Sequence, residues 1–251
     1  MRWLNNIATI TWRELSGFFL SPVAYIVMFL FVLANGILFY VDCLNLEGHP
    51  QQITRIIQSR FSFAVFLAIP ISPLLTMRQL AEERRSGSIE MLMTVPVTES
   101  QVVIGKFLGA QIFYMVIWST LLLFVAVLQA LASPTGPDWG PVWAVYLGLV
   151  FLGAITNSLG LLASALSRNQ LVAAVLSLVG TLAFFFVHTL VYAFPDPGQL
   201  TPVFEYFSVN FHFSLNYANG IIDLRYFGYC LSWALFFLFF SVRTVEASKW
   251  R

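Results

Sequence analysis

Charged residues are scarce in this sequence of 251 residues. Asp, Glu, Lys and Arg make up 10% of it, hydrophobic residues make up 59%, and the mean hydropathy is +0.80. Soluble domains carry about 25% charged residues, so this composition excludes a water-soluble protein and predicts an integral membrane protein. The formal net charge of +1 creates no uniform field, which argues against a nucleic-acid partner.

The residues that membrane enzymes and metalloproteins use are also few. Of the three histidines, His49, His188 and His212, only His188 falls inside a long apolar run. The sequence has no H-E-x-x-H and no G-x-S-x-G motif, and Gly105-Lys106 lacks the upstream glycine of a P-loop. We therefore expect no catalytic residue, no metal or cofactor site and no enzymatic activity in this chain. His188 is either hydrogen-bonded to a neighbouring helix or a functional intramembrane group.

Only two cysteines are present, Cys43 and Cys230, and both lie toward the predicted outer ends of apolar runs. Their spacing does not indicate metal or redox chemistry, and the sequence suggests no third ligand for them. Two interpretations stay open: a disulfide formed in an oxidising compartment, or two free thiols that pack as small apolar groups.

Long apolar runs are abundant. Six charge-free runs follow one another along the chain, and about 20 apolar residues suffice for a helix to cross a bilayer. The sequence thus predicts an all-α integral membrane fold, a single domain over 1–251 with six transmembrane helices. The spans are expected at about 17–41, 61–80, 105–131, 141–166, 170–194 and 226–243.

The distribution of Lys and Arg predicts the orientation, because cytoplasmic loops retain positive charge. Ten of these residues fall on one side of the predicted membrane and three, Arg55, Arg60 and Arg225, on the other. Both termini are therefore expected in the cytoplasm. In residues 1–16, Trp3, Ile7 and Ile10 recur at helical spacing, which predicts an N-terminal interfacial helix; the alternative is a soluble extension of the first span.

The segment 77–106 is the most polar in the chain and holds eight of its 25 charged residues. We expect the second span to continue as a polar helix to about Arg85 and to end at Gly87. A short helix then starts near Ser88, places Ile89, Leu92 and Met93 on one face, and ends at Pro96. Thr98 and Gln101 form a T-x-x-Q capping box before the third span. Apolar side chains outside the bilayer indicate a protein partner or a helix lying on the membrane surface.

Two motifs in this sequence resemble a known family. The pattern Glu82-Glu83-Arg84-Arg85-x-Gly87-Ser88-Ile89-Glu90-x-Leu92-x-x-x-Pro96-Val97, followed by Gly105-Lys106, resembles the cytoplasmic signature of ABC-2 type transporter permeases. The second, from Phe207 to Arg225 and then Tyr229, is similar to the gliding-motility-type branch of that family. With six spans and cytoplasmic ends, the resemblance covers essentially the whole chain.

The resemblance implies the permease subunit of an ABC exporter in a bacterial cytoplasmic (inner) membrane. Such a subunit pairs with itself or a sister permease and docks two cytoplasmic ATPase subunits, which bind ATP and Mg; an extracytoplasmic accessory protein can join them. Residues 86–96 would be the coupling helix that contacts the ATPase. The implied coupling residues are Glu82, Glu83, Arg84, Gly87, Ile89, Glu90, Leu92, Met93 and Pro96.

The resemblance also implies an outer gate in the extracytoplasmic region 195–225, with His212, Gly220 and Asp223 as candidates, although a purely structural cap fits the residues equally. Within the spans, small and polar residues can pack helices together or line a pathway. These residues are Gly105, Gly109, Asn157, Gly160 and His188.

No charged residue falls in the middle of a span, which weighs against an ion-coupled carrier and favours ATP-driven export of an amphipathic or lipid-like substrate. The alternative function is an ATP-independent membrane carrier or a membrane assembly scaffold.

Overall fold

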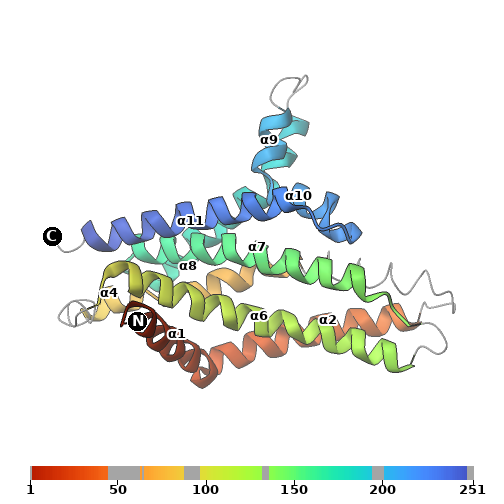
Figure 1. The fold of residues 1–251 in the computed structure, drawn as a ribbon, viewed down its shortest axis with the longest axis horizontal. Helices are drawn as coiled ribbons and strands as arrows, with labels where there is room; N and C mark the ends of the chain where they lie inside the picture. The colour runs from red at the N-terminus through yellow and green to blue at the C-terminus, as the bar shows by residue number, and fades with distance from the viewer. Residues whose placement is uncertain are drawn as a thin grey trace.

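The computed structural model describes residues 2–44, 63, 65–87, 97–131, 136–193 and 201–247. All regular structure in these ranges is helical, and they contain no strand. The all-α prediction is confirmed for this part of the chain. Figure 1 shows the long helices running side by side as an elongated bundle.

The N-terminal helix α1 spans Arg2–Leu20, and α2 follows at Pro22–Leu44. The predicted boundary near residue 16 is therefore four residues early. The break falls at Ser21 because Pro22 lacks an amide N–H and disfavours helical backbone in the residue before it. Figure 1 shows α1 at a steep angle to α2. One face of α1 is buried at Ile7 and Ile10 against the rest of the chain.

The second predicted span is interrupted. A helix over 65–76 ends in a turn at 77–80, and the short helix α4 (Ala81–Ser86) follows. The prediction of one continuous helix to Arg85 is thus wrong, because a side chain of another helix binds the backbone of the turn, as described below. Gly87 ends α4 with a φ of 72°, in the left-handed region that glycine adopts without strain. Residues 88–96 lie outside the described part of the chain.

The central helices are α6 (Glu99–Leu131), α7 (Trp139–Leu166) and α8 (Gln170–Phe186), and the 3-10 helix η1 (Val187–Ala193) continues α8. The predicted capping box at the start of α6 is confirmed, because the Thr98 amide donates to Gln101 Oε1 over 3.1 Å and the Gln101 amide donates to Thr98 Oγ1 over 3.4 Å. Helix α7 is the most enclosed of the three and lies between α6 and α11 in Figure 1.

The C-terminal part contains α9 (Thr201–Phe207), α10 (Val209–Leu215), the 3-10 helix η3 (Tyr217–Asn219) and α11 (Leu224–Ala247). In Figure 1, α9 projects away from the bundle, roughly across the direction of the long helices. The hydroxyl of Tyr229 on α11 donates to the Phe207 carbonyl over 2.9 Å and ties the base of this projection to the bundle.

Five described helices are long and apolar enough to cross a membrane. For the predicted span at 61–80, the described helix covers only 65–76, so the number of six spans stays a prediction. The cytoplasmic location of both termini also stays a prediction. Both cysteines are free thiols in the structure, and Cys230 is buried. The candidate spans are Pro22–Leu44, Glu99–Ala130, Trp139–Leu166, Gln170–Thr189 and Leu224–Ala247.

Candidate functional site

The turn between the helix over 65–76 and α4 is held by one serine of α7. Ser164 Oγ accepts hydrogen bonds from the backbone amides of Leu80 and Ala81, at 3.1 and 3.0 Å, and donates to the Met77 carbonyl over 3.2 Å. The first amides of a helix have no partner within it, and no side chain of α4's own N-cap residue supplies one. Ser164 therefore fixes the start of α4 onto α7.

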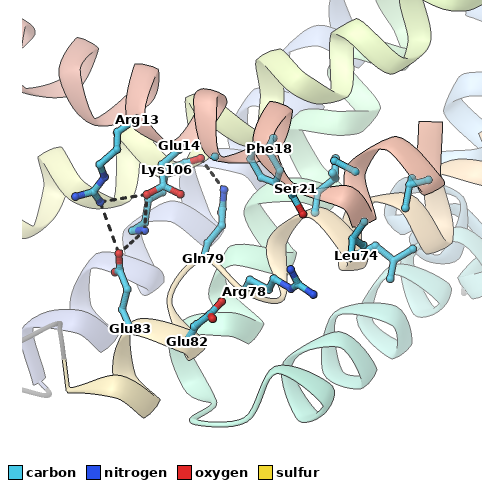
Figure 2. A pocket seen from close by; sticks show the side chains of 15 residues that line it. Arg13, Glu14, Phe18, Ser21, Leu74, Arg78, Gln79, Glu82, Glu83 and Lys106 are labelled. Carbon is cyan, nitrogen blue, oxygen red and sulfur yellow. Dashed lines mark hydrogen bonds and ion pairs between the residues drawn. The ribbon is translucent and has the colours of Figure 1, made fainter. Parts of the chain in front are cut away.

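A buried lysine joins α4 to two other helices. Lys106 of α6 has only 1% of its side chain exposed, and its ammonium lies 2.8 Å from carboxylate oxygens of both Glu14 on α1 and Glu83 on α4. Arg13 completes the cluster, with its guanidinium 3.2 Å from Glu14 and 3.7 Å from Glu83. Figure 2 shows these four side chains converging from three helices. We call Arg13, Glu14, Glu83 and Lys106 the charge node.

The part of the charge node around the buried Lys106 is sensitive to the loss of a partner. A buried charge is tolerated where opposite charges and hydrogen bonds compensate its lost hydration, and removing one partner of a buried pair is strongly destabilising. Two cations and two carboxylates balance here. Gln79 adds a further tie, because its Nε2 donates to the Lys106 carbonyl over 2.9 Å. The node therefore holds the turn, α4 and α1 in fixed positions against α6.

Arg84 attaches α4 to the C-terminal helix. Its Nη2 donates to the Thr244 carbonyl of α11 over 3.0 Å. Burial, and then repulsion from Arg168, lower the pKa of the Arg84 guanidinium from its ordinary value, although arginine keeps its charge in proteins. Adjacent residues of α4 thus bind different parts of the bundle, Glu83 toward α1 and α6, Arg84 toward α11.

Helix α1 lies directly on the first turns of α6 because two glycines permit it. A Cβ added at Gly105 would lie 2.7 Å from Ile10 Cγ2, and one added at Gly109 would lie 2.8 Å from Glu14 Cβ. Thr11 Oγ1 also donates to the Gly105 carbonyl over 3.2 Å. Both glycines of the predicted packing seam therefore face α1, and this close approach brings Glu14 to Lys106.

The structure describes four of the nine predicted coupling residues. Glu82, Glu83 and Arg84 lie on α4, and Gly87 ends it. The other five lie outside the described residues: Ile89, Glu90, Leu92, Met93 and Pro96.

The remaining packing candidates contact other helices. Asn157 Nδ2 donates to Gln111 Oε1 over 3.0 Å, and Gln111 Nε2 donates to the Val150 carbonyl over 2.9 Å, so these amides connect α7 to α6. A Cβ added at Gly160 would meet Thr76 and Ser177. His188 lies in η1 with its ring 4.7 Å from that of Phe211.

The three outer candidates occupy different elements. His212 lies on α10, where its Nε2 is 3.1 Å from the Tyr206 carbonyl and its ring is 4.9 Å from that of Tyr229. Gly220 ends η3 with a φ of 78°. Asp223 precedes α11, and its Oδ1 accepts the amide of Arg225 over 2.8 Å. Gly220 and Asp223 thus shape the turns before α11, whereas His212 packs α10 against Tyr229 of α11.

Sequence reasoning missed Glu14, Gln79 and Ser164 as members of this site and treated Lys106 only as the end of a motif. One signal was present: Glu14 and Lys106 each border a charge-free run, where an unpaired charge is costly. Across the described ranges, no group of three or more His, Cys, Asp and Glu side chains could hold a metal ion.

Comparison with known proteins identifies the family. No protein of curated function matches the chain. The family described as ABC-2 family transporter protein matches residues 8–242, which include all five candidate spans up to the last turn of α11. The chain belongs to the ABC-2 family of transporter proteins.

Proposed function

We propose that this chain is the permease subunit of an ABC transporter and that it exports its substrate when a separate ATPase subunit hydrolyses ATP. Membership of the ABC-2 family supports the permease role, and the apolar helices supply a membrane domain. The gliding-motility-type branch is the closest relationship that the motifs around Phe207 and Gly220 suggest.

The observation that carries the proposal is the charge node beside the start of the proposed coupling helix, residues 86–96, which we call the coupling segment. This segment begins at the last residue of α4, and α4 is bound through Glu83 to the buried Lys106 of α6. A push on the coupling segment by the ATPase would move α4. Because breaking the node leaves a charge uncompensated in a poorly hydrated place, α4 should carry α6 and α1 with it rather than separate from them.

The partners follow from this role. We propose two ATPase subunits that bind ATP and Mg, and a second permease chain that is either identical or a sister subunit. The complex would sit in a bacterial inner membrane with both termini of this chain in the cytoplasm. An extracytoplasmic accessory protein would contact the side of α9 and α10, where His212, Gly220 and Asp223 are the proposed gate residues.

Co-purification with the ATPase tests the coupling role. The full chain is expressed with the ATPase encoded beside it, and the complex is isolated in mild detergent. Leu92→Glu should abolish recovery of the ATPase because it places a charge on the apolar face that the ATPase would cover. Leu44→Glu is the matched control: this exposed leucine ends α2, at the opposite end of the bundle from α4 (Figure 1), and its replacement should leave recovery unchanged.

Two results would contradict the proposal. One is recovery of the ATPase with Leu92→Glu at the wild-type ratio together with wild-type ATP-dependent transport. The other is the absence of any P-loop ATPase gene beside this one, which would favour an ATP-independent carrier or an assembly scaffold.

A further inference from the structure

A cavity lies at the elbow between α1 and α2. Its volume is about 360 Å³, and its walls come from the end of α1, the start of α2, the end of the helix over 65–76, the turn and α4. It sits where the amphipathic helix α1 gives way to the first candidate span, at Pro22. If α2 spans the membrane, the cavity lies near the depth at which phospholipid headgroups meet hydrocarbon.

Two charged side chains that line the cavity do not belong to the charge node. Arg78 and Glu82 line the cavity, are both exposed, and form none of the ion pairs of the described structure. They stand four residues apart, one in the turn and one on α4. Figure 2 shows the Arg78 guanidinium directed away from Lys106, toward the side of the cavity where Ser21 and Leu74 lie. Among the residues that the structure describes, the cavity thus offers one cation and one anion outside the charge node.

The opposite wall is apolar and continues along the first candidate span. Val23 and Val27 line the cavity, and the same stripe of α2 continues at Leu30 and Ile37, which are 55% and 56% exposed. Leu74, on the facing helix, is 39% exposed. An acyl chain that leaves the cavity along this stripe would stay in contact with apolar side chains.

We propose that this cavity binds the headgroup of a phosphatidylethanolamine molecule as a structural lipid, separate from any transported substrate. The phosphate would accept hydrogen bonds from the Arg78 guanidinium, and the primary ammonium would donate to the Glu82 carboxylate. The acyl chains would follow the exposed stripe of α2. A zwitterionic headgroup matches the charges of Arg78 and Glu82, and so leaves this pair neutral.

The chemistry discriminates among common phospholipids. The quaternary ammonium of phosphatidylcholine has no N–H to donate to Glu82, and phosphatidylglycerol has no cation at all. Either lipid would leave the Glu82 carboxylate without the partner that the ethanolamine ammonium supplies. The expected order of binding is therefore phosphatidylethanolamine first, with both other lipids well below it.

Native mass spectrometry of the full chain tests the proposal without any ATPase present, so its outcome is independent of the proposed function. Delipidated protein receives equimolar phosphatidylethanolamine, phosphatidylcholine and phosphatidylglycerol with matched acyl chains, and bound lipids are counted. Wild-type protein should retain one phosphatidylethanolamine selectively. Loss of a charged hydrogen bond in Arg78→Gln should lower this retention about tenfold, and Glu82→Gln should abolish the preference over phosphatidylglycerol.

Further variants separate binding from misfolding and from nonspecific adsorption. Arg78→Lys keeps the cation and should retain the lipid, whereas Arg85→Gln removes an exposed arginine of α4 outside the cavity and should change nothing. Equal retention of the three lipids, unchanged retention in Arg78→Gln, or loss in Arg78→Lys equal to that in Arg78→Gln would overturn the proposal. Displacement by an equal concentration of soluble glycerophosphoethanolamine would overturn it too, because the headgroup alone would then suffice.

Discussion

The ammonium of Lys106 lies 2.8 Å from a carboxylate oxygen of Glu83, and both residues belong to the most polar segment of the chain, 77–106. Glu83 sits on α4, just before the coupling segment, and Lys106 sits within the second turn of α6. The pair thus links the part of the chain that we propose faces the ATPase to a helix long enough to cross the membrane.

Replacement of Lys106 by methionine should destabilise the protein strongly. The variant leaves Glu14 and Glu83 close together without the shared cation, and the expected loss is about 3–5 kcal/mol in the free energy of unfolding. Thermal unfolding in detergent measures it. Arg243→Met is the control, because it breaks the exposed pair with Glu246 and should cost at most about 1 kcal/mol. Equal effects of the two variants would argue against a buried node.

Ser164→Ala should loosen the start of α4. It removes the acceptor of the Leu80 and Ala81 amides, at an expected cost of about 1–3 kcal/mol, and hydrogen exchange at those two amides should accelerate. Ser241→Ala serves as the control, since that buried hydroxyl bonds only the carbonyl four residues earlier in its own helix. Unchanged exchange at Leu80 and Ala81 would mean that Ser164 does not fix the turn.

Gly105→Ala should push α1 away from α6. The new methyl group would approach Ile10 to 2.7 Å, and overpacking of this kind costs about 1–3 kcal/mol. The melting temperature should fall. Gly228→Ala, where nothing lies within 4 Å of the added Cβ, should leave it the same or raise it, because alanine favours helix. A fall of the same size in both variants would show that helix packing is not the cause.

Tyr229→Phe should release the base of the α9 projection. It removes the hydroxyl that donates to the Phe207 carbonyl, which costs about 1 kcal/mol, and limited proteolysis near α9 should become faster. Tyr206→Phe is the matched control, because the Tyr206 hydroxyl forms no hydrogen bond in the described structure. Equal proteolysis of both variants would contradict this role of Tyr229.

Local sequence signals predicted much of the fold. Charge-free runs located the five candidate spans because hydrocarbon admits few charges. Gly87 correctly predicted the end of α4, and the Thr98–Gln101 capping box correctly predicted the start of α6. The turn at 77–80 was missed because Ser164, 84 residues away from Leu80, stabilises it. The site was predicted less fully, since the contact between Glu14 and Lys106 arises only when α1 docks on Gly105 and Gly109.

ATP hydrolysis by the complex reconstituted in lipid tests the central claim most directly, namely that the pair of Glu83 and Lys106 transmits movement between the ATPase and the membrane helices. The account predicts that Glu83→Lys and Lys106→Glu, each in complexes that still contain the ATPase, reduce the rate to that of the isolated ATPase. The double charge-swapped variant should recover part of the lost rate. Wild-type hydrolysis and transport in both single variants would contradict the account.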